Sequence, residues 1–341
     1  MSLTDIQSEQ KIKLAEFIYL LYFSVMLGAK ALGFYEGQLA YNVCLVIGAF
    51  LWCLKILLTK HSVLEYLVMA SLMILGLLVY RSSGEKSLLI FLTMLLGMKC
   101  VSVNRVFRTG AVIWVSVFVS MYVLSVIGVI PEVAYTIDRA SWPPILRHSL
   151  GYPHPNTLHI TYFILSIFVI YACKNLSRKT ITAIAAVLLL GNCYVFIYSL
   201  SRNGFLITSI FICILIYFMY RTRRSKIEDF LIEMIFPICA LSMIVLPFVL
   251  KGELLERVNT IFAGRIKFSL YYLTYEPLKL FGIREIPVPY ESFVIDSSYV
   301  YIIFRLGIIA FALYFIAMML LIHNLVRENK IFDLSVVLAL T

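Results

Sequence analysis

The residues of this sequence that most plainly point to chemistry are four cations, Arg202, Arg265, Lys267 and Arg305. Arg202 lies in the short turn 201–204, between two apolar stretches that are each long enough to cross a bilayer. Charge at that depth is costly and is usually retained for a function. Its guanidinium group offers a rigid fork of donors that suits phosphate oxygens. The alternative is an arginine whose side chain extends to the membrane interface.

Arg265 and Lys267 begin a second segment that could bind an anion. The apolar residues at 266, 270 and 273 recur at helical spacing, which predicts an amphipathic helix lying in the membrane interface. Two cations in its first turn add to the positive end of the helix dipole. The tyrosines of this segment are also typical of an interfacial aromatic belt.

Arg305 follows Asp296, Ser297 and Tyr299 by several residues, in a further apolar stretch. Asp296 or Ser297 is expected to cap the helix that begins there. In a continuous helix Arg305 would then lie about 13 Å from the helix start. We therefore expect it to face the interior of the bundle and to pair with another group.

A fourth candidate segment is His154-Pro155-Asn156, in which prolines flank the histidine on both sides. The prolines restrict the backbone, and Asn156 is expected to be the N-cap of the following helix. One interpretation is only a rigid entry into a helix. The other is that His154 and Asn156 point at a sugar or a phosphate, with His148 and His159 as nearby alternatives.

The candidate residues lie between or within apolar blocks of roughly 16 to 25 residues. Blocks of this length are typical of membrane-spanning helices. The chain has 341 residues, of which 62% are hydrophobic and only 14% charged, against about 25% charged residues in a soluble domain. We expect an all-α polytopic membrane bundle of about 10–11 transmembrane helices, forming a single domain over 1–341. The expected spans are 16–33, 39–58, 64–80, 88–104, 110–130, 156–172, 181–199, 205–220, 229–250 and 298–322. A last apolar block, 331–340, is too short to cross.

Basic residues predict the orientation of these spans. Clusters such as Arg221 to Lys226 fall in alternate loops, which places the N-terminus in the cytoplasm. Two large loops, about 131–155 and 251–297, are then extracytoplasmic. The net charge of +10 is explained by cytoplasmic loops and does not imply nucleic acid. The seven cysteines lie in or beside apolar blocks, and no Cys/His cluster suggests a metal.

The order of these motifs along the last two-thirds of the chain resembles the Wzy-type polysaccharide polymerases, relatives of the O-antigen ligases. The motifs are listed here in chain order: HPN (154–156), SRNG (201–204), GR (264–265) before an aromatic helix, LFGI (280–283), and DSSY (296–299) before Arg305 and Gly307. The first 130 residues add only their hydropathy to this resemblance.

The resemblance implies an enzyme of the cell membrane that joins undecaprenyl-diphosphate-linked oligosaccharide repeat units at the outer leaflet, making capsular polysaccharide, exopolysaccharide or O-antigen. It implies no metal and no other cofactor. The bilayer, a chain-length regulator and a repeat-unit flippase are the expected partners. On this interpretation Arg202 and Arg265 stabilise the leaving diphosphate, while Arg305, Lys267, Asn156 and Tyr299 bind substrate.

The general base is the least defined part of this hypothesis. Related ligases have an essential histidine in the second large outward loop, whereas residues 251–297 contain no histidine. His154 is the nearest replacement, with Asp296 and Glu291 as rivals. Two other functions stay open: a ligase that uses another acceptor, and a transporter or flippase for a lipid or anion.

Overall fold

The long apolar blocks form helices, which satisfy every backbone hydrogen bond within one segment, as a bilayer requires. The computed structural model describes residues 3–139, 142–221, 223–262, 264–289 and 295–341. Within these residues, nine helices are long and apolar enough to cross a membrane. The expected all-α polytopic architecture is confirmed, with nine long helices in place of ten or eleven.

The chain divides into two compact units, which are described separately. Unit 1 comprises residues 1–60 and 97–222, and unit 2 comprises residues 61–96 and 223–341. The elements of unit 1 are α1 (Leu3–Ala31), α2 (Leu39–Leu58), α5 (Val103–Val126), β1 (Ala134–Arg139), β2 (Trp142–His148), α6 (Pro155–Ala172), α7 (Arg178–Ser199) and α8 (Arg202–Tyr220). Those of unit 2 are α3 (Val63–Ser83), α4 (Ser87–Leu96), α9 (Lys226–Val249), α10 (Gly252–Ile261), α11 (Arg265–Tyr275), α12 (Ser298–Tyr301), the π-helical turn η1 (Ile302–Leu306), α13 (Ile308–Arg327) and α14 (Ile331–Ala339).

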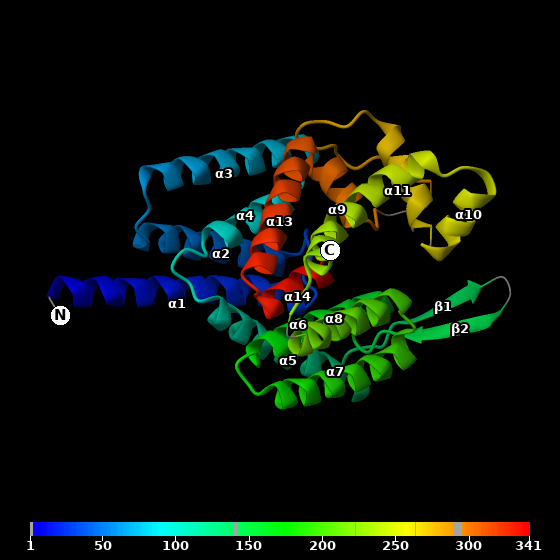
Figure 1. Cartoon of the computed structure of the whole chain (residues 1–341), viewed down its shortest axis with the longest axis horizontal. Helices are drawn as coiled ribbons and strands as arrows, with labels where there is room; N and C mark the ends of the chain where they lie inside the picture. The colour runs from blue at the N-terminus through cyan, green and yellow to red at the C-terminus, as the bar shows by residue number, and fades with distance from the viewer. Residues whose placement is uncertain (1–2, 140–141, 222, 263, 290–294) are drawn as a thin grey trace. The chain divides into compact units, whose positions relative to one another are not determined.

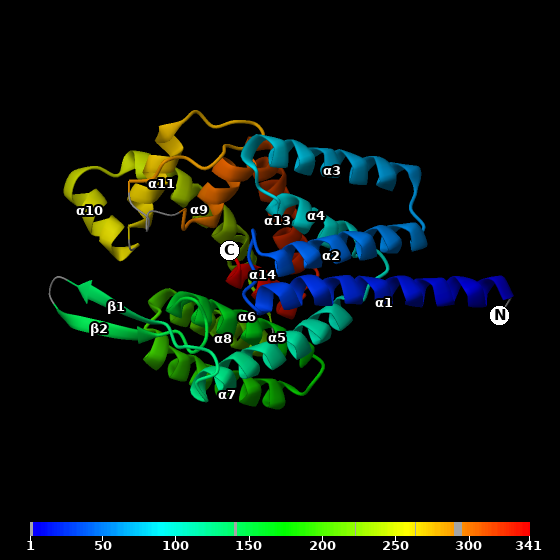
Figure 2. The same ribbon diagram turned by 180° about the vertical axis from the view of Figure 1, so that it is seen from behind.

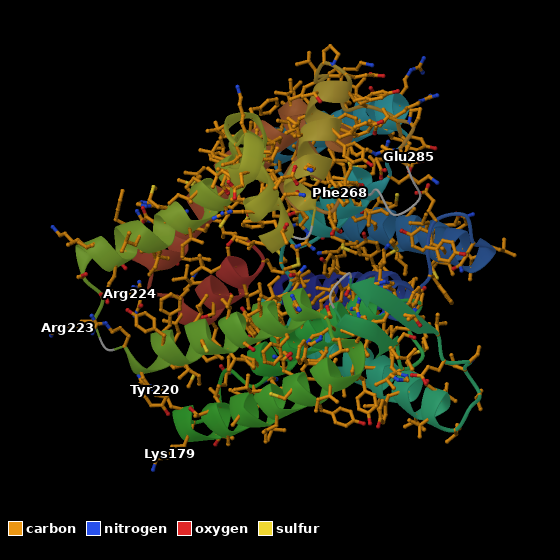
Figure 3. All side chains as sticks on the ribbon, turned by 90° about the vertical axis from the view of Figure 1, so that its right-hand side faces the viewer. Lys179, Tyr220, Arg223, Arg224, Phe268 and Glu285 are labelled. Atoms are coloured by element: carbon orange, nitrogen blue, oxygen red, sulfur yellow. The ribbon has the colours of Figure 1, made fainter. Side chains whose placement is uncertain are left out.

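In unit 1, helices that follow one another along the chain pack side by side. Trp114 of α5 donates from its indole nitrogen to the backbone oxygen of Thr161 on α6, 2.9 Å away. The β1–β2 hairpin extends beyond the ends of α6, α7 and α8 (Figures 1 and 2). Lys179 and Tyr220 lie at the opposite end of α7 and α8 (Figure 3). Unit 1 therefore has a hairpin end, where α6 and α8 begin, and a second end with the α6–α7 connection.

The hairpin is a departure from the loop expected over 131–155. Its strands pair antiparallel, with Tyr135 opposite Arg147 and a register irregularity between Ile137 and Arg139. Tyrosine, threonine and isoleucine in these strands favour the extended backbone. The segment ends at α6, where His154 is the N-cap and Pro155 occupies the first helical position. The expectation that Asn156 is the N-cap was therefore wrong.

In unit 2, the long segment 251–297 contains two helices, α10 and α11, which pack against each other. They are the yellow helices of Figure 2. The helix expected from Arg265 onward is confirmed as α11. A core of Tyr272, Ile283, Val300 and Phe304 joins α11 to the segment before α12 and to η1.

Two expected spans are not continuous helices in the structure. In the block 88–104, α4 ends at Leu96, before Gly97, and α5 begins at Val103 after its N-cap Ser102. The block 298–322 is interrupted at Gly307, with φ of 96° and ψ of 168°. A Cβ at Gly307 would lie 2.3 Å from the backbone oxygen of Leu280. The close approach of that backbone segment ends the turn, so α13 begins only at Ile308.

Candidate functional site

Arg202 is the first residue of α8, and a connection of two residues, Leu200 and Ser201, separates it from the end of α7. Leu200 ends α7 in the left-handed conformation, with φ of 46°. Ser201 precedes α8 as the N-cap without a side-chain capping bond. The Arg202 side chain is exposed and makes no hydrogen bond or ion pair within the described residues. An exposed cation therefore stands at the positive end of a helix dipole, an arrangement that favours an anion.

Ser199 connects this turn to the hairpin and to α6. Arg147 of β2 donates from Nε to the backbone oxygen of Ser199, 2.6 Å away. A second donor of Arg147 reaches Oδ1 of Asn156 at 2.6 Å. Arg147 is only 7% exposed. Its buried charge is therefore aimed at the end of α7 and the start of α6, next to the turn that carries Arg202.

His159 continues this polar network into unit 1. Its Nδ1 lies 2.9 Å from the hydroxyl oxygen of Ser199, and its Nε2 lies 2.7 Å from Oδ1 of Asn192. Asn192 in turn donates to the backbone oxygen of Phe205, in the first turns of α8. Ser199, His159 and Asn192 are fully buried. Buried polar groups of this kind are hydrogen-bonded because each unmade bond is costly.

Gly204 permits the close approach of α8 to α6. A Cβ at this position would lie 2.6 Å from Cγ of His159 and 2.7 Å from its Cβ. No real side chain fits at that distance. The glycine of the SRNG turn is therefore required by the imidazole behind it.

His154 uses its Nδ1 to accept a hydrogen bond from the backbone N–H of Asn156, 3.1 Å away. In the neutral ring the proton then lies on Nε2. Burial lowers the pKa of His154, and the positive charge of Arg147 lowers it further. The ring also packs on Tyr135, with centroids 4.8 Å apart. In this geometry the Nε2–H of His154 can donate a hydrogen bond. The lone pair on Nδ1, which a general base would use, already accepts the bond from the Asn156 N–H.

Arg305 lies in unit 2, where it is buried and paired with another side chain, as expected. Arg305 lies in the η1 turn, which continues directly from α12 and ends before Gly307. It faces the interior and donates from Nε to Oε1 of Glu85 at 3.0 Å. Tyr301 donates to the other oxygen of Glu85 at 2.8 Å. The charge of Arg305 is thus compensated by a carboxylate.

The cations of α11 also have carboxylate partners. Arg265 donates to Oδ2 of Asp296 at 3.0 Å, and Nζ of Lys267 lies 2.7 Å from Glu256. Asp296 therefore receives a charged hydrogen bond. The cap of α12 is Ser297, one of the two expected residues. The Tyr299 hydroxyl donates to the backbone oxygen of Thr341.

The structure thus brings together some predicted residues and not others. In unit 1 it joins Asn156 and the Arg202 turn through Arg147, which was not among the candidates. Arg147 follows two apolar residues in β2, and its bonds to Ser199 and Asn156 are visible only in the folded chain. In unit 2, Glu85 was missed because its partner Arg305 lies 220 residues away in the sequence. Glu291 lies outside the described residues, and a common site of Arg202 with the cations of unit 2 stays a prediction.

Within the described part of the chain, no three His, Cys, Asp or Glu side chains are grouped so that they could hold a metal ion. No protein-family model matches the sequence, and comparisons with curated proteins and with solved structures give no match either.

Proposed function

We propose that this protein polymerises oligosaccharide repeat units that are carried on a lipid diphosphate, as the order of its sequence motifs suggests. The observation that carries the proposal is the exposed guanidinium group of Arg202. It stands at the start of α8 and makes no bond with another side chain among the described residues. A diphosphate on a membrane-embedded tail would meet a positive helix end and a fork of N–H donors there.

The expected orientation is consistent with this role. The end of unit 1 opposite the hairpin carries many basic residues: Arg105, Arg108, Lys174, Arg178 and Lys179. Short basic segments of this kind favour the cytoplasmic side. The hairpin end, with Arg202, would then face the outside of the cell membrane.

In the proposed reaction, an acceptor hydroxyl oxygen bonds to the anomeric carbon of the donor as the bond from that carbon to the diphosphate breaks. The acceptor proton leaves to a base, and the lipid diphosphate departs with its electron pair. Arg202 stabilises the negative charge that grows on the diphosphate. His154, with its proton on Nε2, donates a hydrogen bond to substrate, in place of the base role expected from the sequence.

The test is polymer synthesis by purified protein supplied with lipid-linked repeat units. Arg202→Ala should abolish chain extension while the amount of folded protein stays unchanged. Arg202→Lys should retain partial activity, because it keeps the charge and loses the fork. Arg257→Ala is the matched control, since Arg257 is an exposed arginine that pairs with Glu253 on its own helix. Normal polymer length from Arg202→Ala would contradict the proposal.

A transporter is the second candidate, and one observation favours it. The helix broken at Gly307, beside the buried pair of Arg305 and Glu85, has the form of an interrupted helix in a transporter. Reconstituted vesicles separate the two functions. Longer glycans indicate a polymerase, and movement of lipid-linked units without new glycosidic bonds indicates a transporter. A ligase would instead transfer the glycan to another acceptor that is added to the same assay.

A further inference from the structure

We propose that His159 is a positioning residue that holds the Arg202 turn in the form that binds substrate. The identity of that substrate rests on the proposed function, whereas the ordering of the turn by His159 does not. Three observations carry the inference: the hydrogen-bond directions around the imidazole, the bond from Ser199 to the turn, and the left-handed Leu200 between the anchored residues.

The hydrogen-bond directions follow from Asn192. Its Nδ2 donates to the backbone oxygen of Phe205 at 3.1 Å and to the hydroxyl of Ser209 at 3.0 Å. Oδ1 of Asn192 therefore faces His159 and can only accept. The proton of the neutral imidazole must lie on Nε2, which leaves Nδ1 to accept from the Ser199 hydroxyl. Every polar atom of this chain of contacts is then satisfied with an uncharged ring.

Ser199 connects the imidazole of His159 to the turn by hydrogen bonds. Its hydroxyl oxygen accepts a hydrogen bond from the backbone N–H of Ser201 at 3.3 Å. Its backbone oxygen accepts from Arg147. Leu200, between these two serines, has a φ of 46°, a conformation that a leucine rarely adopts. A strained residue persists only where its surroundings hold it in place, and here the contacts on both sides of Leu200 do so.

The same three residue types occur in catalytic triads, in which a serine hydroxyl is activated by a histidine and an acidic or amide partner. Burial excludes that role in this structure. The hydroxyl of Ser199, the imidazole of His159 and the amide of Asn192 belong to fully buried residues, so none of them reaches a substrate. These three residues can therefore affect the reaction only by fixing the conformation of the turn that carries Arg202.

The experiment compares Ser199→Ala with Ser166→Ala in full-length protein. Ser166 is an equally buried serine of α6, but its hydroxyl bonds within its own helix, to the backbone oxygen of Tyr162. In Ser199→Ala, hydrogen exchange at the Ser201 amide should accelerate roughly tenfold to a hundredfold, because a buried donor loses its acceptor. The KM for the lipid-linked donor should rise by about tenfold. His159→Gln should give the same two changes, and Ser166→Ala should give neither.

Unchanged exchange at Ser201 in either Ser199→Ala or His159→Gln would overturn the proposal, because the link from the imidazole to the turn would then be absent. Faster exchange with an unchanged KM in an active protein would also overturn it, because the turn would then not need to be ordered for binding. If the wild-type protein makes no polymer, the proposed function is wrong. The exchange measurement then decides by itself whether His159 orders the turn. If His159→Gln does not fold, the milder Ser199→Ala still gives the answer.

Discussion

Arg147 donates a hydrogen bond from Nε to the backbone oxygen of Ser199, 2.6 Å away, and so ties the hairpin to the turn between α7 and α8. The two residues are 52 positions apart in the sequence. Because Arg147 also reaches Asn156, one buried side chain fixes the start of α6 relative to the end of α7. The residues proposed to contact substrate at the hairpin end all adjoin this contact.

Replacing Arg147 with alanine should destabilise the protein by about 3 kcal/mol. Two charge-assisted hydrogen bonds are lost, and the backbone oxygen of Ser199 is left buried without this donor. The measurement is the unfolding temperature in detergent. The unfolding temperature of Arg147→Lys should lie between those of the wild type and Arg147→Ala, since lysine keeps the charge and cannot make both directed bonds. Wild-type stability of Arg147→Ala would show that the hairpin does not hold the turn.

Gly204→Ala should destabilise unit 1 by about 1–3 kcal/mol, the usual cost of overpacking a well-filled interior. The new Cβ would lie 2.6 Å from Cγ of His159. Gly28→Ala is the control, because nothing lies within 4 Å of a Cβ built at this helical position. It should be neutral, or stabilising by about 0.5–1 kcal/mol from helix propensity. Equal effects of the two substitutions would argue against the close contact at Gly204.

Glu85 and Arg305 should show strong coupling in a double-mutant cycle. Their side chains are 20% and 8% exposed, so removing one partner leaves a largely buried charge without its counter-ion. Glu85→Leu alone and Arg305→Met alone should each cost about 3 kcal/mol. The double variant should cost clearly less than the sum, because no unpaired charge remains. Additive losses in the unfolding free energy would contradict a direct ion pair.

The loss of stability on acidification should be smaller in His154→Asn than in the wild type. Burial and Arg147 lower the pKa of His154 in the folded protein, so the unfolded chain takes up a proton first as the pH falls. Stability is therefore lost from about pH 6.5 downward, until the folded side chain is protonated as well. Asparagine cannot titrate and is a good helix N-cap.

The measurement is the unfolding temperature of both proteins at pH 7.5 and at pH 5. The difference between the two pH values should be smaller for His154→Asn. The other four histidines are unchanged in both proteins, and their contribution cancels in the comparison. If the unfolding temperatures of both proteins change equally between the two pH values, His154 has the same pKa in the folded and the unfolded chain.

Much of the helical architecture follows from local sequence properties. The length and hydropathy of the apolar blocks place α2 at 39–58, and α6 and α9 within a few residues of the predicted bounds. Ser177 and Ser225 begin α7 and α9 as side-chain caps. Such signals are local because a helix bonds to itself. The hairpin was not foreseen, since strand formation depends on pairing with a second segment.

The candidate site was only partly predictable for the same physical reason. The sequence by itself determined that Arg202 lies in a short turn between two spans and that α11 begins with two cations. Only the tertiary structure decided which cations have partners. Arg305 meets Glu85 across 220 residues of sequence, and Arg265 meets Asp296 across 31.

The break at Gly307 is likewise decided by a distant backbone segment, at Leu280 and Gly282, and not by the helix itself. Hydropathy and capping act within a few residues along the chain and can be read from it. Charge pairing and close backbone contact act through space, so they are settled only when the chain has folded. Only the folded chain therefore shows that Arg202 has no partner among the described residues. It also shows that Arg147 and His159 both contact Ser199, beside the turn that carries Arg202.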